Sequence, residues 1–286
     1  MKVLLCGAYG KLGTDILKEL VKQGHEVLAA DLKTREIEGI EGQYEKVSVD
    51  VTRPDTLRGI CEGKDAVITT VGLTGSSQTV TAYDIDYQGN LNLLNAAKRA
   101  GVKHFAYVSV LKADNPRAAK VPMLDAKAKM EKELKNSGIS YTIYRPTGYF
   151  YDIVKVFKPM VQKGKVTLLG KDDISCNVID TPDLAEFIVS HMTENNQTYN
   201  IGGTETYTYQ EIAGMMFKVN GKEPQISRAP AVLFDVLAFV NKVKKTGKEG
   251  VLRFSKWTLS EPMVADIHYG KGSFKKYIEE NGKAGA

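Results

Sequence analysis

Short apolar runs alternate with amphipathic stretches along the first half of this chain. The apolar runs predict buried strands, at 3–6, 26–30, 44–49, 66–70, 104–108 and 139–145. Apolar residues at helical spacing between these runs predict helices, at 12–21, 54–60, 80–100 and 125–137. Strands and helices that alternate in this way form a parallel sheet with helices on both faces, so the pattern predicts a doubly wound α/β fold.

The pattern is looser beyond residue 148. It predicts further helices, at 150–161, 181–191, 208–217 and 271–280, and strands at 165–169 and 198–201. Thr208 and Glu211 have the spacing of a capping box, which favours a helix start there. We therefore expect a main domain over 1–148 and a smaller C-terminal α/β lobe over 149–286, interleaved with the first rather than independent.

Three glycines lie at the junction between the first strand and the first helix. Gly7, Gly10 and Gly13 form this group. In such a junction the first glycine allows a tight turn, a later one lets the backbone approach a pyrophosphate, and the last lets the helix pack on the strand. The helix N-terminus adds free N–H groups and a partial positive charge. The motif predicts a Rossmann-type dinucleotide site, and the missing Gly-Lys-Ser/Thr excludes a P-loop.

An acidic residue ends the second predicted strand. Asp31 follows the glycines by roughly 20 residues, where a carboxylate binds both ribose hydroxyls of the adenosine. This carboxylate would repel a 2′-phosphate, which favours NAD(H). Lys33 and Arg35 follow closely, and their positive charges favour NADP(H). We expect NAD(H) or NADP(H) as the cofactor, with a preference for NAD(H).

Composition and charge narrow the class of protein. The 286 residues are 43% apolar and 26% charged, and the net charge of +5 is spread along the chain, which does not indicate nucleic-acid binding. Cys6, Cys61 and Cys176 are far apart and lack metal-ligand spacing, so we expect no metal and a reducing compartment. The chain enters a strand directly, without a signal peptide, and we expect a cytoplasmic protein.

One apolar stretch allows two interpretations. Residues 231–243 are strongly apolar, and Lys242, Lys244, Lys245 and Lys248 lie at or beyond their end. Such a segment can lie on a membrane surface. More often it forms a helix over a substrate pocket, so we expect a small-molecule substrate as the partner and treat membrane binding as the less favoured alternative.

Several stretches resemble one protein family. The segment Gly7-Ala-Tyr-Gly-Lys-Leu-Gly13 resembles the Gly-x-x-Gly-x-x-Gly motif of extended and atypical short-chain dehydrogenases/reductases. Other stretches resemble their fourth helix (86–102), their fifth strand (103–109) and the sixth strand of the atypical, NmrA-like branch (137–147). Within that branch, residues 145–150, 179–188 and 199–203 are most similar to divinyl chlorophyllide reductase-type proteins. The chain is also similar to isoflavone-reductase-like proteins.

The resemblance implies a cofactor site that extends beyond the glycines and Asp31. The further residues it assigns to the cofactor are Tyr9, Lys11, Leu12, Leu32, Asp50, Val51, Thr70, Val71, Gly72, Ser109, Lys127, Pro146 and Thr147. The first three would lie at the pyrophosphate and the next three at the adenosine. Thr70 to Gly72 would line the middle of the dinucleotide, and Lys127, Pro146 and Thr147 would lie near the nicotinamide.

The resemblance also implies a catalytic lysine. In the family motif Tyr-x-x-x-Lys, the tyrosine exchanges a proton with the substrate. Here Lys127 matches the lysine, Glu131 follows as in the NmrA-like branch, and Met123 replaces the tyrosine. Two functions are then open: an NAD(P)H-dependent reductase of a small or medium apolar substrate, with Lys127 as ribose anchor and candidate acid, or a non-catalytic NAD(P)-binding redox sensor. A nucleotide-sugar epimerase is disfavoured because those enzymes use the tyrosine. The wider family also implies a homodimer through the fourth and fifth helices.

Overall fold

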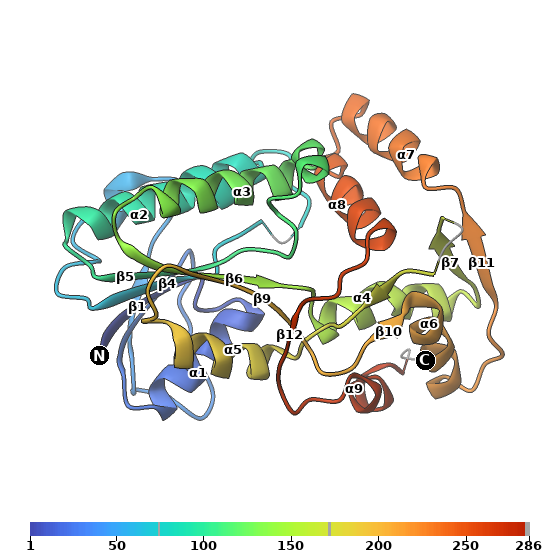
Figure 1. The fold of residues 1–286 in the computed structure, drawn as a ribbon, viewed down its shortest axis with the longest axis horizontal. Coiled ribbons are helices and arrows are strands. Elements are labelled where there is room, and N and C mark those ends of the chain that lie inside the picture. Colours follow the sequence, from blue (N-terminus) through green and yellow to red (C-terminus); the bar gives the residue numbers. More distant parts are fainter. Residues whose placement is uncertain (74, 171–172, 284–286) are drawn as a thin grey trace. The chain divides into compact units, whose positions relative to one another are not determined.

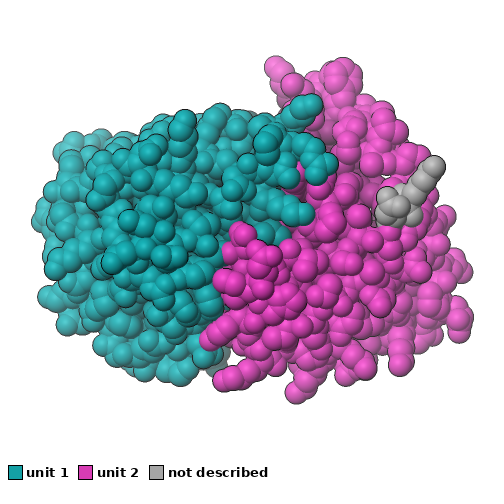
Figure 2. Space-filling view, viewed as in Figure 1, with its two compact units in different colours: residues 1–145, 184–199 teal, residues 146–183, 200–286 magenta. Residues whose placement is uncertain are grey.

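The structure, a computed structural model, describes residues 1–73, 75–170 and 173–283. The chain forms two compact units, which Figure 2 colours separately. The first contains residues 1–145 and 184–199, and the second contains residues 146–183 and 200–286. The chain therefore leaves the first unit, returns to it for a short segment, and leaves it again.

The first unit is built on a parallel sheet (Figure 1). Its strands are β1 (Lys2–Cys6), β2 (Glu26–Asp31), β3 (Glu45–Ser48), β4 (Ala66–Thr69), β5 (His104–Val108) and β6 (Ser140–Pro146). Their order is β6-β5-β4-β1-β2-β3, and every neighbouring pair is parallel. Strands β9 (Gln197–Gly202) and β12 (Ile267–His268) extend this sheet beyond β6 to eight strands. The predicted doubly wound Rossmann-type α/β fold is confirmed.

Helices cover both faces of the sheet in the first unit (Figure 1). They are α1 (Lys11–Lys22), α2 (Asn90–Arg99), α3 (Pro122–Lys135) and α5 (Thr181–His191), with shorter helical turns η1 (Pro54–Leu57), η2 (Tyr83–Gly89) and η3 (Pro116–Lys120). Alternate residues of a strand point to opposite faces. Leu4 and Cys6 therefore pack with Leu93 and Met130 on one face, while Val3 and Leu5 are buried on the other. Burial on both faces explains why β1 is apolar throughout.

The second unit combines small sheets with helices. Its helices are α4 (Phe150–Gln162), α6 (Tyr209–Val219), α7 (Val232–Val243), α8 (Glu249–Ser260) and α9 (Phe274–Asn281). Strands β7 (Val166–Leu169) and β11 (Ile226–Ala229) form a parallel pair, and β8 (Ser175–Cys176) and β10 (Tyr207–Thr208) an antiparallel pair. The predicted capping box is confirmed, because Thr208 accepts from the Glu211 N–H and the Glu211 carboxylate accepts from the Thr208 N–H.

Two helix predictions differ from the structure. The predicted helix at 54–60 is wrong: only the 3₁₀ turn η1 forms, because Arg58 is extended and Gly59 takes φ +76°. The predicted helix at 80–100 begins as the π-helical turn η2. There the Asn90 side-chain amide donates to the carbonyls of Ile85 and Asp86.

Among the described residues, no helix is long and apolar enough to cross a membrane.

Candidate functional site

Two of the three motif glycines are required by close contacts within the chain. Gly7 follows β1 with φ +80°, and a β-carbon there would lie 2.5 Å from Thr70 Oγ1. A β-carbon at Gly13, in the first turn of α1, would lie 1.9 Å from the Gly7 carbonyl oxygen. These contacts hold the end of β1 against the start of α1, as the motif predicts.

Gly10 has no such requirement within the chain. Its φ of −67° suits any residue, and the nearest atom to a β-carbon would be the Gly7 carbonyl oxygen, 3.5 Å away. Gly10 is exposed and is the N-cap of α1, which has no side-chain cap and no acidic residue in its first turn. The N–H groups at the start of α1, beside Gly10, Lys11, Leu12 and Gly13, therefore have no side-chain cap and form a cradle that fits an anion such as a pyrophosphate.

Opposite charges hold the loop at Tyr9. Asp31, at the end of β2, accepts from the Tyr9 N–H (3.0 Å) and from the Leu32 N–H (2.7 Å). The Arg35 guanidinium donates to the Tyr9 carbonyl (3.2 Å) and to Thr14 Oγ1 (3.3 Å). Burial and the neighbouring Tyr44 raise the pKa of Tyr9 to about 12, so its phenol stays protonated at neutral pH. Asp31 and the cationic Arg35 thus lie at the same loop, next to the glycines.

The residues expected at the adenine lie after β3. Asp50 Oδ1 accepts from the N–H (2.9 Å) and the hydroxyl (2.7 Å) of Thr52, which forms a tight polar turn. Val51 is buried, and its methyl group lies beneath Gly89 of η2. Leu32, which the resemblance places with Asp31 at the adenosine ribose, is 62% exposed. An exposed apolar side chain beside Asp31 offers a surface for a flat base.

The end of β4 is fixed by a buried polar network. Thr70 Oγ1 donates to the Gly7 carbonyl (3.0 Å), which joins the end of β4 to the glycine loop. Asn90 accepts from Thr69 Oγ1 (2.7 Å) and donates to the Val71 carbonyl (3.1 Å). A β-carbon at Gly72 would lie 2.8 Å from Asp86 Oδ1, so the backbone passes directly over that carboxylate.

Lys127 lies within this network. Its Nζ is 3.2 Å from Asp86 Oδ1 and donates to the Val108 carbonyl (3.3 Å). It also lies 5.4 Å from the centre of the Tyr107 ring. The Lys127 side chain is 12% exposed and that of Asp86 only 1%. The structure therefore places the ammonium beside Gly72, at the carboxyl ends of β4 and β5, where parallel sheets bind ligands.

Ser109 has a structural partner instead. Its hydroxyl donates to Glu131 Oε1 (2.5 Å), and the same carboxylate binds the Arg145 guanidinium through both of its oxygens. Arg145 also pairs with Asp114 (2.9 Å). Ser109, Glu131 and Arg145 are all buried. This cluster links α3 to the ends of β5 and β6, and the Ser109 proton is committed to it.

Pro146 and Thr147 belong to the second unit. Pro146 is the last residue of β6. The Thr147 N–H donates to the Ile201 carbonyl (3.1 Å), and its hydroxyl donates to the Asn177 carbonyl (2.8 Å). The N–H and the hydroxyl of Thr147 therefore both have partners within that unit.

Sequence reasoning missed Asp86 as the partner of Lys127. Asp86 opens the stretch that resembles the fourth-helix signature, but it is 41 residues from Lys127. No local spacing connects the two. Asp86 and Asn90 share a helix face with Leu93 and Ala97, and this was the available signal, because buried polar side chains need partners.

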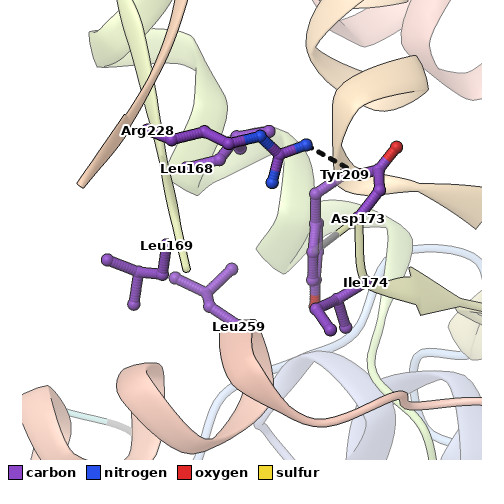
Figure 3. A pocket seen from close by; sticks show the side chains of 7 residues that line it. All are labelled: Leu168, Leu169, Asp173, Ile174, Tyr209, Arg228 and Leu259. Atoms are coloured by element: carbon purple, nitrogen blue, oxygen red, sulfur yellow. Dashed lines mark ion pairs between the residues drawn. The ribbon is translucent and has the colours of Figure 1, made fainter. Parts of the chain in front are cut away.

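A hollow in the second unit has different surroundings (Figure 3). Its lining residues are Leu168, Leu169, Asp173, Ile174, Tyr209, Arg228 and Leu259. Arg228 and Asp173 form an ion pair of 3.6 Å at its edge. Its empty volume of about 200 Å³ is partly open to solvent and is smaller than the roughly 300–1,000 Å³ of ligand pockets. It includes none of the predicted site residues.

Over residues 1–73, 75–170 and 173–283, no group of three or more His, Cys, Asp or Glu side chains is arranged to hold a metal ion.

Comparison with known proteins identifies the family. The NAD(P)H-binding protein family matches residues 7–195, which contain the glycine loop, Asp31 and Lys127. Photosystem II assembly factor Ycf39 of Guillardia theta is 29% identical over 242 residues, which are 82% of this chain and 74% of that protein. Divinyl chlorophyllide a 8-vinyl-reductase of Arabidopsis thaliana is 30% identical over 281 residues, 86% of this chain and 64% of that protein.

The fold agrees with this assignment. Triphenylmethane reductase of Citrobacter sp., solved with NADP(H), aligns with a TM-score of 0.74 over 98% of this chain and 100% of its own, at 18% identity. The cradle at Gly10 and the family match lead to the same conclusion. This chain belongs to the NAD(P)H-binding family, within the atypical, NmrA-like short-chain dehydrogenases/reductases.

Proposed function

We propose that this protein is an NAD(P)H-dependent reductase of a small or medium apolar substrate, and that Lys127 is its central polar residue. The observation that carries the proposal is the position of the Lys127 ammonium beside Gly72, paired with buried Asp86. The names of two similar proteins support it, because the Arabidopsis and Citrobacter proteins are both named as reductases.

The chain's own residues have distinct roles in this proposal. The N–H groups beside Gly10 hold the pyrophosphate, and Asp31 holds the adenosine ribose. The bound cofactor supplies hydride from its nicotinamide. An ammonium has three N–H donors. Among the described residues, the Val108 carbonyl accepts from one of them and the Asp86 carboxylate pairs with the ammonium at 3.2 Å. We assign a remaining donor to the nicotinamide ribose or to a substrate oxygen or carbanion that takes up a proton.

Because Met123 stands where the family has a tyrosine, Lys127 lacks the tyrosine that donates the proton in the family motif. Met123 lies one helical turn before Lys127 in α3 and is partly buried. A thioether has no proton to donate, so the tyrosine's part of the chemistry passes to Lys127 or to water. Asp86 then acts as a positioning residue, because its carboxylate fixes the ammonium.

Measuring turnover tests the proposal. NADH and NADPH oxidation is followed at 340 nm with a panel of triphenylmethane dyes, quinones and conjugated vinyl compounds, and deuteride transfer from C4-labelled cofactor is read by mass spectrometry. Lys127→Ala should reduce kcat at least about 100-fold for any accepted compound. Lys129→Ala is the matched control, since Lys129 is on the same helix but exposed and paired with Asp125 at 2.6 Å. Full turnover by Lys127→Ala would contradict the assignment.

A non-catalytic redox sensor is the second candidate function. Met123 favours it, and the relative from Guillardia theta is named as an assembly factor rather than an enzyme. The sensor would bind reduced and oxidised cofactor with different affinities and turn over none of the panel. Calorimetric titration with all four cofactor forms, combined with the turnover assay, separates the two candidates.

We propose NAD(H) as the preferred cofactor, with Arg35 as the residue that opposes this preference. The Asp31 carboxylate lies at the loop and would repel a 2′-phosphate. Asp31→Asn should shift the affinity ratio toward NADPH by about tenfold or more, and Arg35→Glu should shift it toward NADH. If the unmodified protein binds NADPH more tightly, as the NADP(H) complex of the Citrobacter protein would suggest, Arg35 dominates.

We also propose a cytoplasmic location. Cys6, Cys61 and Cys176 are free and buried, which suits a reducing compartment.

A further inference from the structure

Helix α7 carries a broad apolar surface that faces away from its neighbour. The exposed apolar residues of the helix are Val232, Leu233, Val236, Leu237, Phe239, Val240 and Val243. Their exposed fractions lie between 38% and 65%. At about 100° per residue, all seven fall on one arc of about 160°. Single exposed apolar residues are common, but a continuous arc of this width marks an interaction surface.

The opposite side of α7 packs on α8 within the second unit (Figure 1). Ala238 is buried there, and Asp235 pairs with Lys256 of α8 at 2.6 Å. The hairpin of α7 and α8 therefore has its own internal contacts and leaves the apolar arc outside.

Positive charge lies at the C-terminal end of the apolar arc and on α8. Between 231 and 257 the chain has six basic and two acidic side chains, a net charge of +4. Both acidic residues are paired, Asp235 with Lys256 and Glu249 with Arg253 (3.0 Å) and Lys242 (3.9 Å). Lys244, Lys245 and Lys248 follow the arc and are exposed. In the described parts of the chain, no ion pair involves these three lysines.

A second copy of this chain is a poor occupant of the arc. A two-fold interface brings the same patch of both subunits together. Here it would place two segments of net charge +4 against each other, which costs electrostatic energy. A partner with an apolar interior and a negatively charged surface would bind both the apolar arc and the lysines that follow it.

We propose that α7 and the lysines that follow it dock this protein on an anionic phospholipid surface. The apolar arc of α7 enters the boundary between headgroups and acyl chains, while Lys244, Lys245 and Lys248 contact lipid phosphates. The helix has only 12 residues, so it lies on the bilayer rather than crossing it. This inference uses residues outside the cofactor site and holds whichever function that site has.

Vesicle flotation of the full chain tests the proposal. The protein should float with phosphatidylcholine–phosphatidylglycerol vesicles, less with pure phosphatidylcholine, and progressively less as salt increases. Lys244→Glu/Lys245→Glu should reduce binding to the anionic vesicles more than about tenfold. Val236→Ser/Phe239→Ser should reduce it by a similar factor, because the apolar contact is lost.

Matched controls are available in the same unit. Val156→Ser changes an exposed apolar residue of α4, and Lys163→Glu/Lys165→Glu changes two exposed lysines, so both should bind vesicles like the unmodified protein. Circular dichroism and cofactor titration check that every variant is folded. No flotation with anionic vesicles, or equal loss in the controls, overturns the proposal. A third outcome would assign the arc to a protein partner instead. In that case the protein does not bind vesicles but self-associates with increasing concentration, and Val236→Ser/Phe239→Ser abolishes the self-association.

Discussion

The three motif glycines differ in what an added methyl group would meet, and this difference can be measured. A β-carbon at Gly13 would collide with the Gly7 carbonyl, whereas a β-carbon at Gly10 has no atom closer than 3.5 Å. Gly10→Ala should therefore cost about 1 kcal/mol or less of folding free energy. The same substitution should weaken cofactor binding at least about tenfold, since the methyl group occupies the cradle.

Gly13→Ala is the matched comparison and should be the more damaging to stability. It should lower the free energy of unfolding by about 2 kcal/mol or more, because backbone must move to accept the methyl group. Urea denaturation gives the stabilities, and calorimetry with NADH and NADPH gives the affinities. If folded Gly10→Ala binds the cofactor with unchanged affinity, the pyrophosphate does not bind at this cradle.

At the scale of single residues, the sequence predicts a site best when its residues lie close together in the chain. Gly7, Gly10, Gly13 and Asp31 lie close together in the chain, and their spacing reflects one strand–turn–helix–strand unit. The pairing of Asp86 with Lys127 joins η2 to α3 and depends on how these elements pack. A pairwise contact of this kind has no signature in a single sequence.

At the scale of elements, one buried carboxylate of α3 ties this helix to the ends of β5 and β6. Glu131 accepts from Ser109 and from Arg145, and all three are buried. Among the described residues, Glu131→Ala would leave the Arg145 guanidinium paired with Asp114, whose side chain is 62% exposed. We expect a loss of about 3 kcal/mol or more of folding free energy, because a buried charge loses its main partner.

Two further variants separate charge from packing at this position. Ser109→Ala should cost only about 1 kcal/mol, since it removes one hydrogen bond and leaves the ion pair. Glu131→Leu combined with Arg145→Leu should recover part of the loss, because it removes both charges. Urea unfolding monitored by circular dichroism provides the three values. Equal stability of Glu131→Ala and the unmodified protein would show that this cluster does not hold α3.

Element predictions succeeded where the apolar pattern was clear and failed where an element was very short or its pattern was mixed. The predicted strand at 104–108 coincides with β5, and the apolar stretch 231–243 forms α7. Strands β8, β10 and β12 have two residues each, too few for any periodicity to appear. Helix α8 mixes charged and apolar residues and was not predicted. Packing against α7 stabilises α8 as a helix, whereas its own sequence pattern does not predict one.

At the scale of the whole molecule, the reactivity of the three thiols measures how well the core of each unit is buried. Cys6 and Cys61 lie in the first unit and Cys176 in the second, and all are buried. Burial raises the pKa of Cys61 to about 11 and that of Cys176 to about 12, and it raises the pKa of Cys6 further. At pH 8 a thiol with a pKa of 11 is ionised in only about one molecule in a thousand.

We therefore expect none of the three thiols to react with Ellman's reagent in the folded protein at pH 8. All three should react rapidly in urea, where burial is lost and each pKa returns toward its ordinary value. Peptide mapping after partial labelling identifies which thiol reacts first as urea increases. Fast labelling of Cys61 in the folded protein would contradict the burial described for it.

The order in which the chain is made matters for the first unit. Tyr144 of β6 packs edge-on against Phe187, stacks on Tyr199 and donates to the Ile188 carbonyl. All three partners follow a 38-residue excursion into the second unit, residues 146–183. On the ribosome, β6 therefore emerges with one side uncovered and waits several seconds for α5 at ordinary elongation rates of roughly 5–20 residues per second. A chaperone or a protease has its best access to this protein during that interval.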